Sequence, residues 1–163
     1  MLNRRTFVGA GLTLCLGAML SACAEPEPVG PSIREIIDTN ASLSTLARAL
    51  STAGVVSLGD AGPWTVFAPR NSAFEKLPEG ELERLFLPEN RVELTRIMQL
   101  HIVAGRYTAA QLVNRTTTLT TLSGLNIIVD GFVGINIGGV ALVQPDVNAG
   151  NGVIHIIDSV ILP

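Results

Sequence analysis

The stretch from Gly152 to Pro163 constrains the fold most, because its apolar residues fill both alternating sets of an extended chain. One face of the strand would carry Ile154, Ile156 and Val160, and the other would carry Val153, Ile157 and Ile161. A strand with two apolar faces is buried only if other elements cover both of them. The stretch therefore predicts a central strand rather than an edge strand.

The first half of the folded region has the apolar spacing of helices. Leu43, Leu46, Ala47 and Leu50 recur at the i, i+3, i+4, i+7 positions of one helix face, and Gly54 is a suitable stop. Shorter helical patterns cover 33–37, 81–86, 91–100 and 108–113. These patterns predict several short helices that each bury one face.

Strand patterns dominate the second half. Residues 64–68 predict an early strand, followed by a helical turn that Asn71 or Ser72 would cap. Residues 125–129, 132–137 and 140–143 are separated by Asp130-Gly131 and Gly138-Gly139, which favour a meander of hairpins. Helices first and strands later, without regular βαβ alternation, predict an α+β domain.

The N-terminus has the pattern of a lipoprotein export signal. Arg4-Arg5 precede an apolar run over 8–20, and Leu20-Ser21-Ala22-Cys23 closes it. We interpret residues 1–22 as a signal peptide and Cys23 as the lipidated first residue of the mature protein. An ordinary signal peptide with an incidental cysteine is the alternative. The Arg pair also fits a twin-arginine signal, although ordinary positive charges explain it equally well.

Residues 23–31 then form a proline-rich tether, and residues 32–163 form one domain. Cys15 leaves with the signal and Cys23 is acylated, so we expect no intramolecular disulfide. Without Arg4 and Arg5, nine basic residues remain against fourteen acidic ones, a net charge of −5. The negative charge argues against nucleic acid as a partner. Because there is no basic cluster to bind anionic lipids, we expect the lipid on Cys23 to be the contact with the membrane.

Two segments carry a resemblance to a known family. Thr65-Val66-Phe67-Ala68-Pro69-Arg70-Asn71-Ser72-Ala73-Phe74 and the stretch from Gly152 to Pro163 resemble the paired signature segments of the fasciclin I domain. Leu100-His101-Ile102-Val103 falls where that family has its Tyr-His segment, with Leu100 in place of the Tyr. The resemblance implies a fasciclin-like β-wedge or β-sandwich flanked by several short helices. It also implies an extracellular binding module associated with adhesion and without shared catalytic chemistry.

The signature residues are expected to form a structural latch. A carboxylate on an apolar strand needs partners, so we expect Asp158 to contact the corner from Thr65 to Asn71. The candidate donors are the Thr65 hydroxyl, the Asn71 amide and the corner's backbone N–H groups, with Arg70 as charge partner. The latch comprises Thr65, Phe67, Pro69, Asn71, Phe74, His155 and Asp158. If Asp158 belongs to this latch, the substitution Asp158→Asn should lower the melting temperature by several degrees. The alternative role for Asp158 is that of a ligand-binding carboxylate.

The other polar residues indicate no catalytic or metal site. His155, Asp158 and Ser159 superficially suggest a hydrolytic triad, but residues three apart on a strand face opposite sides. His101 and His155 lie in apolar stretches, where neutral core imidazoles are expected, and no third ligand stands at a metal-binding spacing. The sequence therefore predicts no enzyme activity, no metal and no cofactor.

The sequence favours an exported, lipid-anchored binding module of a bacterial cell envelope. It would mediate adhesion or cell-surface and extracellular-matrix interaction through a protein or glycan partner, and self-association is possible. Ala24 after Cys23 favours the outer membrane, with the domain facing the periplasm or the exterior. Partner contacts are expected on the loops of the meander, and the adhesion-associated segment Leu100 to Val103 is expected to pack in the core. The alternative is a periplasmic small-ligand carrier with an apolar cleft between helices and sheet.

Overall fold

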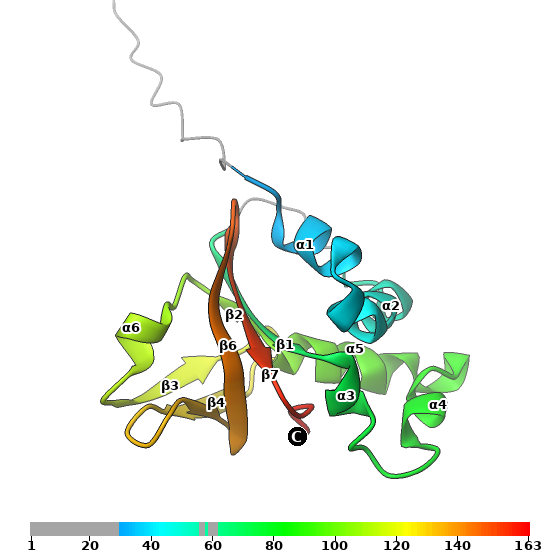
Figure 1. Cartoon of the computed structure of the whole chain (residues 1–163). Coiled ribbons are helices and arrows are strands. Elements are labelled where there is room, and N and C mark those ends of the chain that lie inside the picture. The colour runs from blue at the N-terminus through cyan, green and yellow to red at the C-terminus, as the bar shows by residue number, and fades with distance from the viewer. Residues whose placement is uncertain (1–29, 56–57, 59–61) are drawn as a thin grey trace, which may run out of the picture.

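The computed structural model of the chain describes residues 30–55, 58 and 62–163, so the predicted signal peptide and the lipidation of Cys23 lie outside the described residues. The helices are α1 (Ile33–Thr39), η1 (Ala41–Leu43), α2 (Ser44–Ala53), α3 (Asn71–Phe74), α4 (Glu81–Leu85), η3 (Pro88–Asn90), α5 (Arg91–Leu100) and α6 (Ala109–Leu112). The strands are β1 (Trp64–Pro69), β2 (Ile102–Ala104), β3 (Thr116–Thr120), β4 (Asn126–Asp130), β5 (Asn136–Ile137), β6 (Val140–Ala149) and β7 (Gly152–Ile157). Helices α1 to α5 gather on one side of β1 and β7, and β3, β4 and α6 lie on the other (Figure 1).

The strands form one mixed sheet in the order β2-β1-β7-β6-β5-β4-β3. The last strand, β7, lies between β1, with which it is parallel, and β6, with which it is antiparallel. All six of its residues are buried. The predicted central strand and the predicted α+β class are both confirmed.

The two faces of β7 belong to two hydrophobic clusters, as the doubled apolar pattern predicted. Ile154 packs in the cluster between the sheet and the helices, together with Val66 and Ala68 of β1, and Ile157 packs in a second cluster with Phe67 and with residues of the meander. The strand ends at Ile157, before the predicted end, but Val160 and Ile161 still pack in the first and the second cluster, respectively. The sheet curls around this second cluster, because Val103 at one end of the sheet bridges Thr121 at the other.

The predicted helices form, with small differences in their ends. Helix α1 begins with a capping box between Ser32 and Glu35, and α2 ends at Gly54, whose φ of 74° is the left-handed conformation of a C-cap. The stop predicted at Gly54 is therefore confirmed.

The meander differs from its predicted outline in three places. The strand predicted over 132–137 is reduced to β5, because residues 131–135 form a loop. Strand β6 continues to Ala149 through two register shifts, which break the alternation beyond Val143. Strand β3 was not predicted, because in a run of threonines only Leu119 is buried.

Candidate binding surface

The two signature segments lie side by side along the parallel pair of β1 and β7. The register runs from Trp64 opposite Gly152 to Pro69 opposite Ile157. On one face the ring of Phe67 stacks on His155, with centroids 5.7 Å apart and an interplanar angle of 22°. The backbone ladder and this ring contact join the segments.

Asp158 does not contribute to that junction in the predicted way. It follows the end of β7, and one carboxylate oxygen accepts a hydrogen bond from Lys76 Nζ at 2.8 Å. The bond from Lys76 lowers the pKa of Asp158, and the charge of Arg70 lowers it further. The expected bonds from Thr65 and Asn71 are wrong: Asp158 sits at the surface, with 28% of its side chain exposed, so solvent and Lys76 satisfy it.

Thr65 and Asn71 hold other segments instead. The buried Thr65 hydroxyl donates to Gly105 O at 2.7 Å and accepts from Tyr107 N–H at 2.9 Å, which fixes the loop after β2. Asn71 Oδ1 accepts from Thr45 N–H at 3.0 Å, and its Nδ2 donates to Ala41 O at 2.9 Å. The corner between β1 and α3 therefore supports α2. Pro69 and Phe74 are buried at this corner.

Both histidines are fully committed to backbone partners. His101 Nδ1 lies 2.7 Å from Ile97 O and must carry the proton there, while Nε2 accepts from Ile161 N–H at 3.0 Å. His155 Nε2 likewise donates to Tyr107 O at 2.7 Å, while Nδ1 accepts from Asp146 N–H at 3.2 Å.

Burial sets the charge state of these two imidazoles. It lowers the pKa of His101 to about 4 and also lowers the pKa of His155. Both are therefore neutral at pH 7, as predicted from their apolar context. Neither has a free ring nitrogen to serve as a general base.

The segment from Leu100 to Val103 is part of the interior. Its four side chains are no more than 2% exposed. Leu100 and His101 end α5, and Ile102 and Val103 form β2 against β1. The packing role predicted for this segment is confirmed, and these side chains offer no contact surface to a partner.

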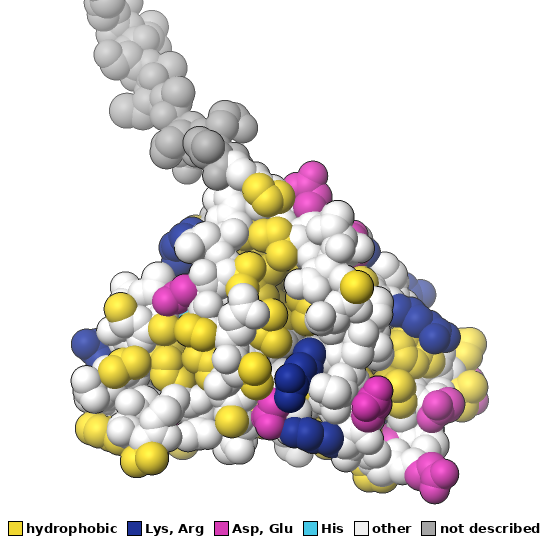
Figure 2. All heavy atoms as spheres, in the orientation of Figure 1, with side chains coloured by type: hydrophobic (Ala, Val, Ile, Leu, Met, Phe, Trp, Pro, Cys, Tyr) yellow, Lys and Arg dark blue, Asp and Glu magenta, His cyan; other side chains and the backbone are white. Residues whose placement is uncertain are grey.

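The exposed apolar side chains lie largely on the meander. On β4, Ile127 and Val129 point into the core while Ile128 points outward. Two of them lie in the loop after β4, where Phe132 is 64% and Val133 is 89% exposed. Among the aromatic side chains, Phe132 is exposed, whereas Trp64, Phe86 and Tyr107 are half-buried. Apolar side chains are visible at the lower left of the space-filling view, over this part of the molecule (Figure 2).

Four of these side chains lie on β4, on the loop that follows it and on β6, and β5 pairs with both strands. Asn136 pairs with both Asp130 and Ala141, so these three residues form one row across β4, β5 and β6. Ile128 lies two residues before Asp130, and Val143 two beyond Ala141, and both side chains are exposed. Phe132 and Val133 lie in the loop that begins directly after Asp130, and both are exposed. We call Ile128, Phe132, Val133 and Val143 the tip patch.

The charges around the tip patch are few. Residues 116–149 contain no Lys or Arg, and their acidic residues are Asp130 and Asp146. Asp130 accepts a hydrogen bond from Phe132 N–H at 3.0 Å, which fixes the base of the loop. The patch is therefore suited to apolar contact rather than to an anionic partner.

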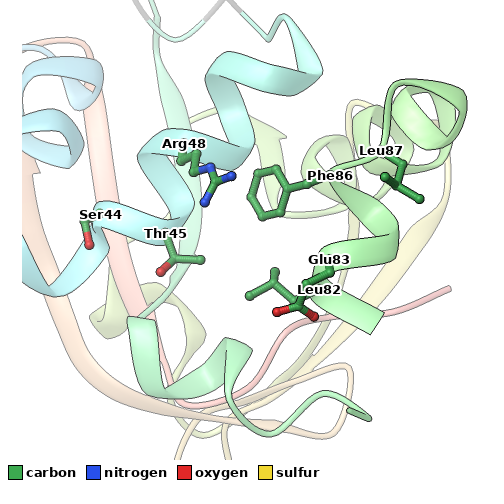
Figure 3. Close-up of a pocket in the computed structure, with 7 residues that line it drawn as sticks. All are labelled: Ser44, Thr45, Arg48, Leu82, Glu83, Phe86 and Leu87. Carbon is green, nitrogen blue, oxygen red and sulfur yellow. The ribbon is translucent and has the colours of Figure 1, made fainter. Parts of the chain in front are cut away.

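A separate hollow of about 590 Å³ lies between α2 and α4 (Figure 3). Its lining residues are Ser44, Thr45, Arg48, Leu82, Glu83, Phe86 and Leu87. The ligand cleft expected from the sequence would lie between the helices and the sheet. This hollow is a different site, because both of its walls are helical.

Two further findings concern metals and membranes. In the part of the chain that the structure describes, no group of three acidic, His or Cys side chains is arranged to hold a metal ion. Over the same residues, every helix is too short or too polar to cross a bilayer.

Comparisons with known proteins agree with this architecture. The family model described as Fasciclin domain matches residues 41–163. Protein sll1483 of Synechocystis sp. is 43% identical over 136 residues, which cover 81% of this chain and 73% of that protein. Human periostin is 36% identical over 139 residues, which cover 83% of this chain but 16% of periostin.

A solved structure shares the fold. A FAS1 domain pair from the insect cell adhesion molecule Fasciclin I superimposes with a TM-score of 0.71 at 21% identity. The match covers 82% of this chain and 51% of that one, so the chain spans about half of the domain pair.

Proposed function

The chain belongs to the Fasciclin domain family, and from that premise we propose that it is a cell-surface binding module for adhesion. It would be exported, anchored to the bacterial envelope by a lipid on Cys23, and would bind a protein or glycan partner without turnover or cofactor. The observation that carries the proposal is the tip patch, whose apolar side chains are exposed on a hydrogen-bonded loop and on strands of the sheet.

The position of the tip patch supports this role. Pro31 O accepts a hydrogen bond from Gly150 N–H at 2.9 Å, so the start of the described chain lies beside the far end of β6. The loop after β4 lies at the opposite end of the molecule (Figure 1). A lipid on Cys23 would leave the tip patch directed away from the membrane and towards a partner.

A protein partner fits the patch better than a charged glycan, because apolar and aromatic side chains dominate protein interfaces. Phe132 would serve as the anchor that enters a pocket of the partner. The lipid would position the module, and the sheet would hold the loop rigid.

Binding of the fluorescently labelled protein to whole cells, matrix proteins and glycan arrays tests the proposal. We expect saturable binding that unlabelled protein displaces. The double variant Phe132→Ser/Val133→Ser should weaken it by at least about tenfold. Val92→Ser, which replaces a residue that is 75% exposed on α5, is the matched control. Absence of saturable binding, or equal loss in both variants, would refute the proposal.

The lipid anchor has its own test. Cells that express the protein are grown with radiolabelled palmitate, and the protein is then isolated. Label should enter the protein, and Cys23→Ala should lose it and release the protein from the membrane fraction. A membrane-bound Cys23→Ala protein would contradict the anchor.

A further inference from the structure

The hollow between α2 and α4 has two chemically different walls. On α2, Ser44, Thr45 and Arg48 form a polar wall, and on the α4 side Leu82, Phe86 and Leu87 form an apolar one (Figure 3). We propose that this hollow binds a small amphipathic monocarboxylate, a molecule with an aliphatic or aromatic chain that ends in one carboxylate. This site is separate from the tip patch and goes beyond the adhesive role.

Arg48 would receive the carboxylate. Its guanidinium carbon lies over the Phe86 ring, 4.5 Å from the ring centroid, so the aromatic ring supports the cation. The N–H groups of the guanidinium remain available, because among the described residues no carboxylate pairs with Arg48. Arg34, Lys76 and Arg84, by contrast, each have an acidic partner. A guanidinium with a free edge binds a carboxylate through two parallel hydrogen bonds.

The opposite wall would hold the chain of the ligand. Leu82 and Phe86 stand four residues apart and so share one face of α4 and its continuation. Leu87 is exposed beside them. A volume of about 590 Å³ lies within the range of small-ligand sites, roughly 300 to 1,000 Å³.

Glu83 would limit the ligand to one negative charge. Its side chain is exposed at the rim on the apolar side, and none of the ion pairs found among the described residues involves it. A second carboxylate at the far end of a ligand would approach Glu83 and be repelled. The walls therefore select an anionic head and a neutral tail.

Hydrogen bonds outside the hollow keep both walls in place. Asn71 holds the first turn of α2 through Thr45 N–H. Arg84 pairs with Glu81 and with Glu93, which fixes α4 to α5, and Asn90 donates to Arg84 O at 2.7 Å. The hollow is thus largely formed before a ligand enters.

Three ligands with one tail and different heads test the proposal: 4-phenylbutyrate, 4-phenylbutanol and 4-phenylbutylamine. Calorimetric titration of the purified protein should show the carboxylate binding at least about tenfold more tightly than the alcohol or the amine. NMR shifts caused by 4-phenylbutyrate should centre on Arg48 and Phe86. Equal affinity for the three heads, no saturable binding of 4-phenylbutyrate, or shifts centred elsewhere would overturn the proposal.

Variants separate the site from the rest of the surface. Arg48→Gln should reduce the affinity for 4-phenylbutyrate to that for the alcohol, and Glu83→Gln should raise it. Arg96→Gln, at an exposed position on α5, should leave it unchanged. Unchanged binding in Arg48→Gln would refute the role of that residue. The tip-patch double variant should bind 4-phenylbutyrate as the wild type does, so the two proposals fail independently.

Discussion

Thr65 shows how one buried hydroxyl can fix a loop that lies some forty residues away in sequence. It is fully buried and serves as donor to Gly105 and as acceptor for Tyr107. His155 reaches the same loop from β7 through Tyr107 O. The two side chains together hold the chain between β2 and α6 against the sheet.

Thr65→Val should destabilise the protein by roughly 2 kcal/mol. Valine keeps the shape but leaves Gly105 O and Tyr107 N–H without partners inside the protein. Urea unfolding at pH 7 measures the loss, and Thr118→Val, on the exposed face of β3, is the control. Equal stability of the two variants would show that water replaces the lost bonds.

The buried imidazole of His101 makes the stability fall in acid. In the unfolded chain it takes up a proton near its ordinary pKa of 6.5, whereas in the folded protein it does so only near pH 4. Between these values protons favour the unfolded chain, so the free energy of unfolding should drop by roughly 3 kcal/mol as the pH falls from 7 to 4. His155 acts in the same direction, since its pKa is also lowered.

Unfolding of the wild type and of His101→Gln across this pH range measures the effect. The variant should show a shallower decline, because one of the titrating groups is gone. NMR titration of the wild type gives the pKa of His101 directly, even if the variant folds poorly. A folded-state pKa near 6.5 would contradict the expectation.

Asp158→Asn should cost less than about 1 kcal/mol, because the pair with Lys76 is solvent-exposed. The side chain of Lys76 is 51% exposed and that of Asp158 is 28% exposed. Thermal unfolding in low and high salt measures the loss, which should shrink as salt screens the pair. A drop of several degrees that persists in high salt would restore the buried latch expected from sequence.

The sequence predicted the state of the histidines but not the partner of Asp158. An apolar neighbourhood is visible in the chain around His101 and His155, and burial follows from it. The partner Lys76 is 82 residues away and follows α3, so only the folded geometry brings its ammonium to Asp158.

Helix α2 owes part of its start to a residue outside it. Asn71, at the start of α3, accepts from Thr45 N–H and contacts the Ser44 hydroxyl, which caps the first turn from a distance. The sequence suggested Asn71 as a cap for its own helical turn. The structure shows that this side chain serves the neighbouring helix instead, because the corner after β1 points at the start of α2.

Asn71→Ala should therefore lower the free energy of unfolding by about 1 kcal/mol, the usual cost of losing a helix cap. Hydrogen exchange should also become faster at Thr45, while the last turn of α2 keeps its protection. Ser72→Ala, at the next position, is the control. Unchanged exchange at Thr45 would show that the cap is dispensable.

Elements with an uninterrupted apolar signal were predictable, and those shaped by bulges were not. The apolar residues on both faces of β7 indicate a central strand, and the spacing of apolar residues in α2 indicates a helix with one buried face. In β6 the alternation of apolar and polar residues is interrupted near Asp146, which has a positive φ of 53°. In β3 the alternation is weak, because most of its threonines are exposed to solvent. These strands exist because a neighbour pairs with them, which local spacing does not record.

The whole molecule depends on one long-range pairing. β1 and β7 are parallel neighbours, although the rest of the sheet lies between them in sequence. Both hydrophobic clusters include residues of this pair, so neither core is complete without it. Periodicity predicted a central last strand, but it did not predict which strand would lie beside it. The resemblance to the fasciclin family implied a β-wedge or β-sandwich flanked by helices and paired the two signature segments, but the strand order comes from the structure.

Removal of β7 should abolish the fold rather than weaken it. A chain that stops before Gly152 would expose the interior faces of β1 and β6 and lose the join between the two clusters. We expect no cooperative unfolding transition and rapid proteolysis of such a chain. A chain that lacks only Leu162 and Pro163, which are exposed, should unfold as the full protein does. Cooperative unfolding of the shorter chain would refute this dependence.

The place of β7 also governs the order of events during synthesis. A ribosome makes the helices and six of the seven strands before it makes the strand that lies between β1 and β6. The nascent chain must therefore carry its apolar surfaces uncovered until β7 has been translated. During this interval the exposed apolar surfaces favour aggregation, and a chaperone that covers them would limit it.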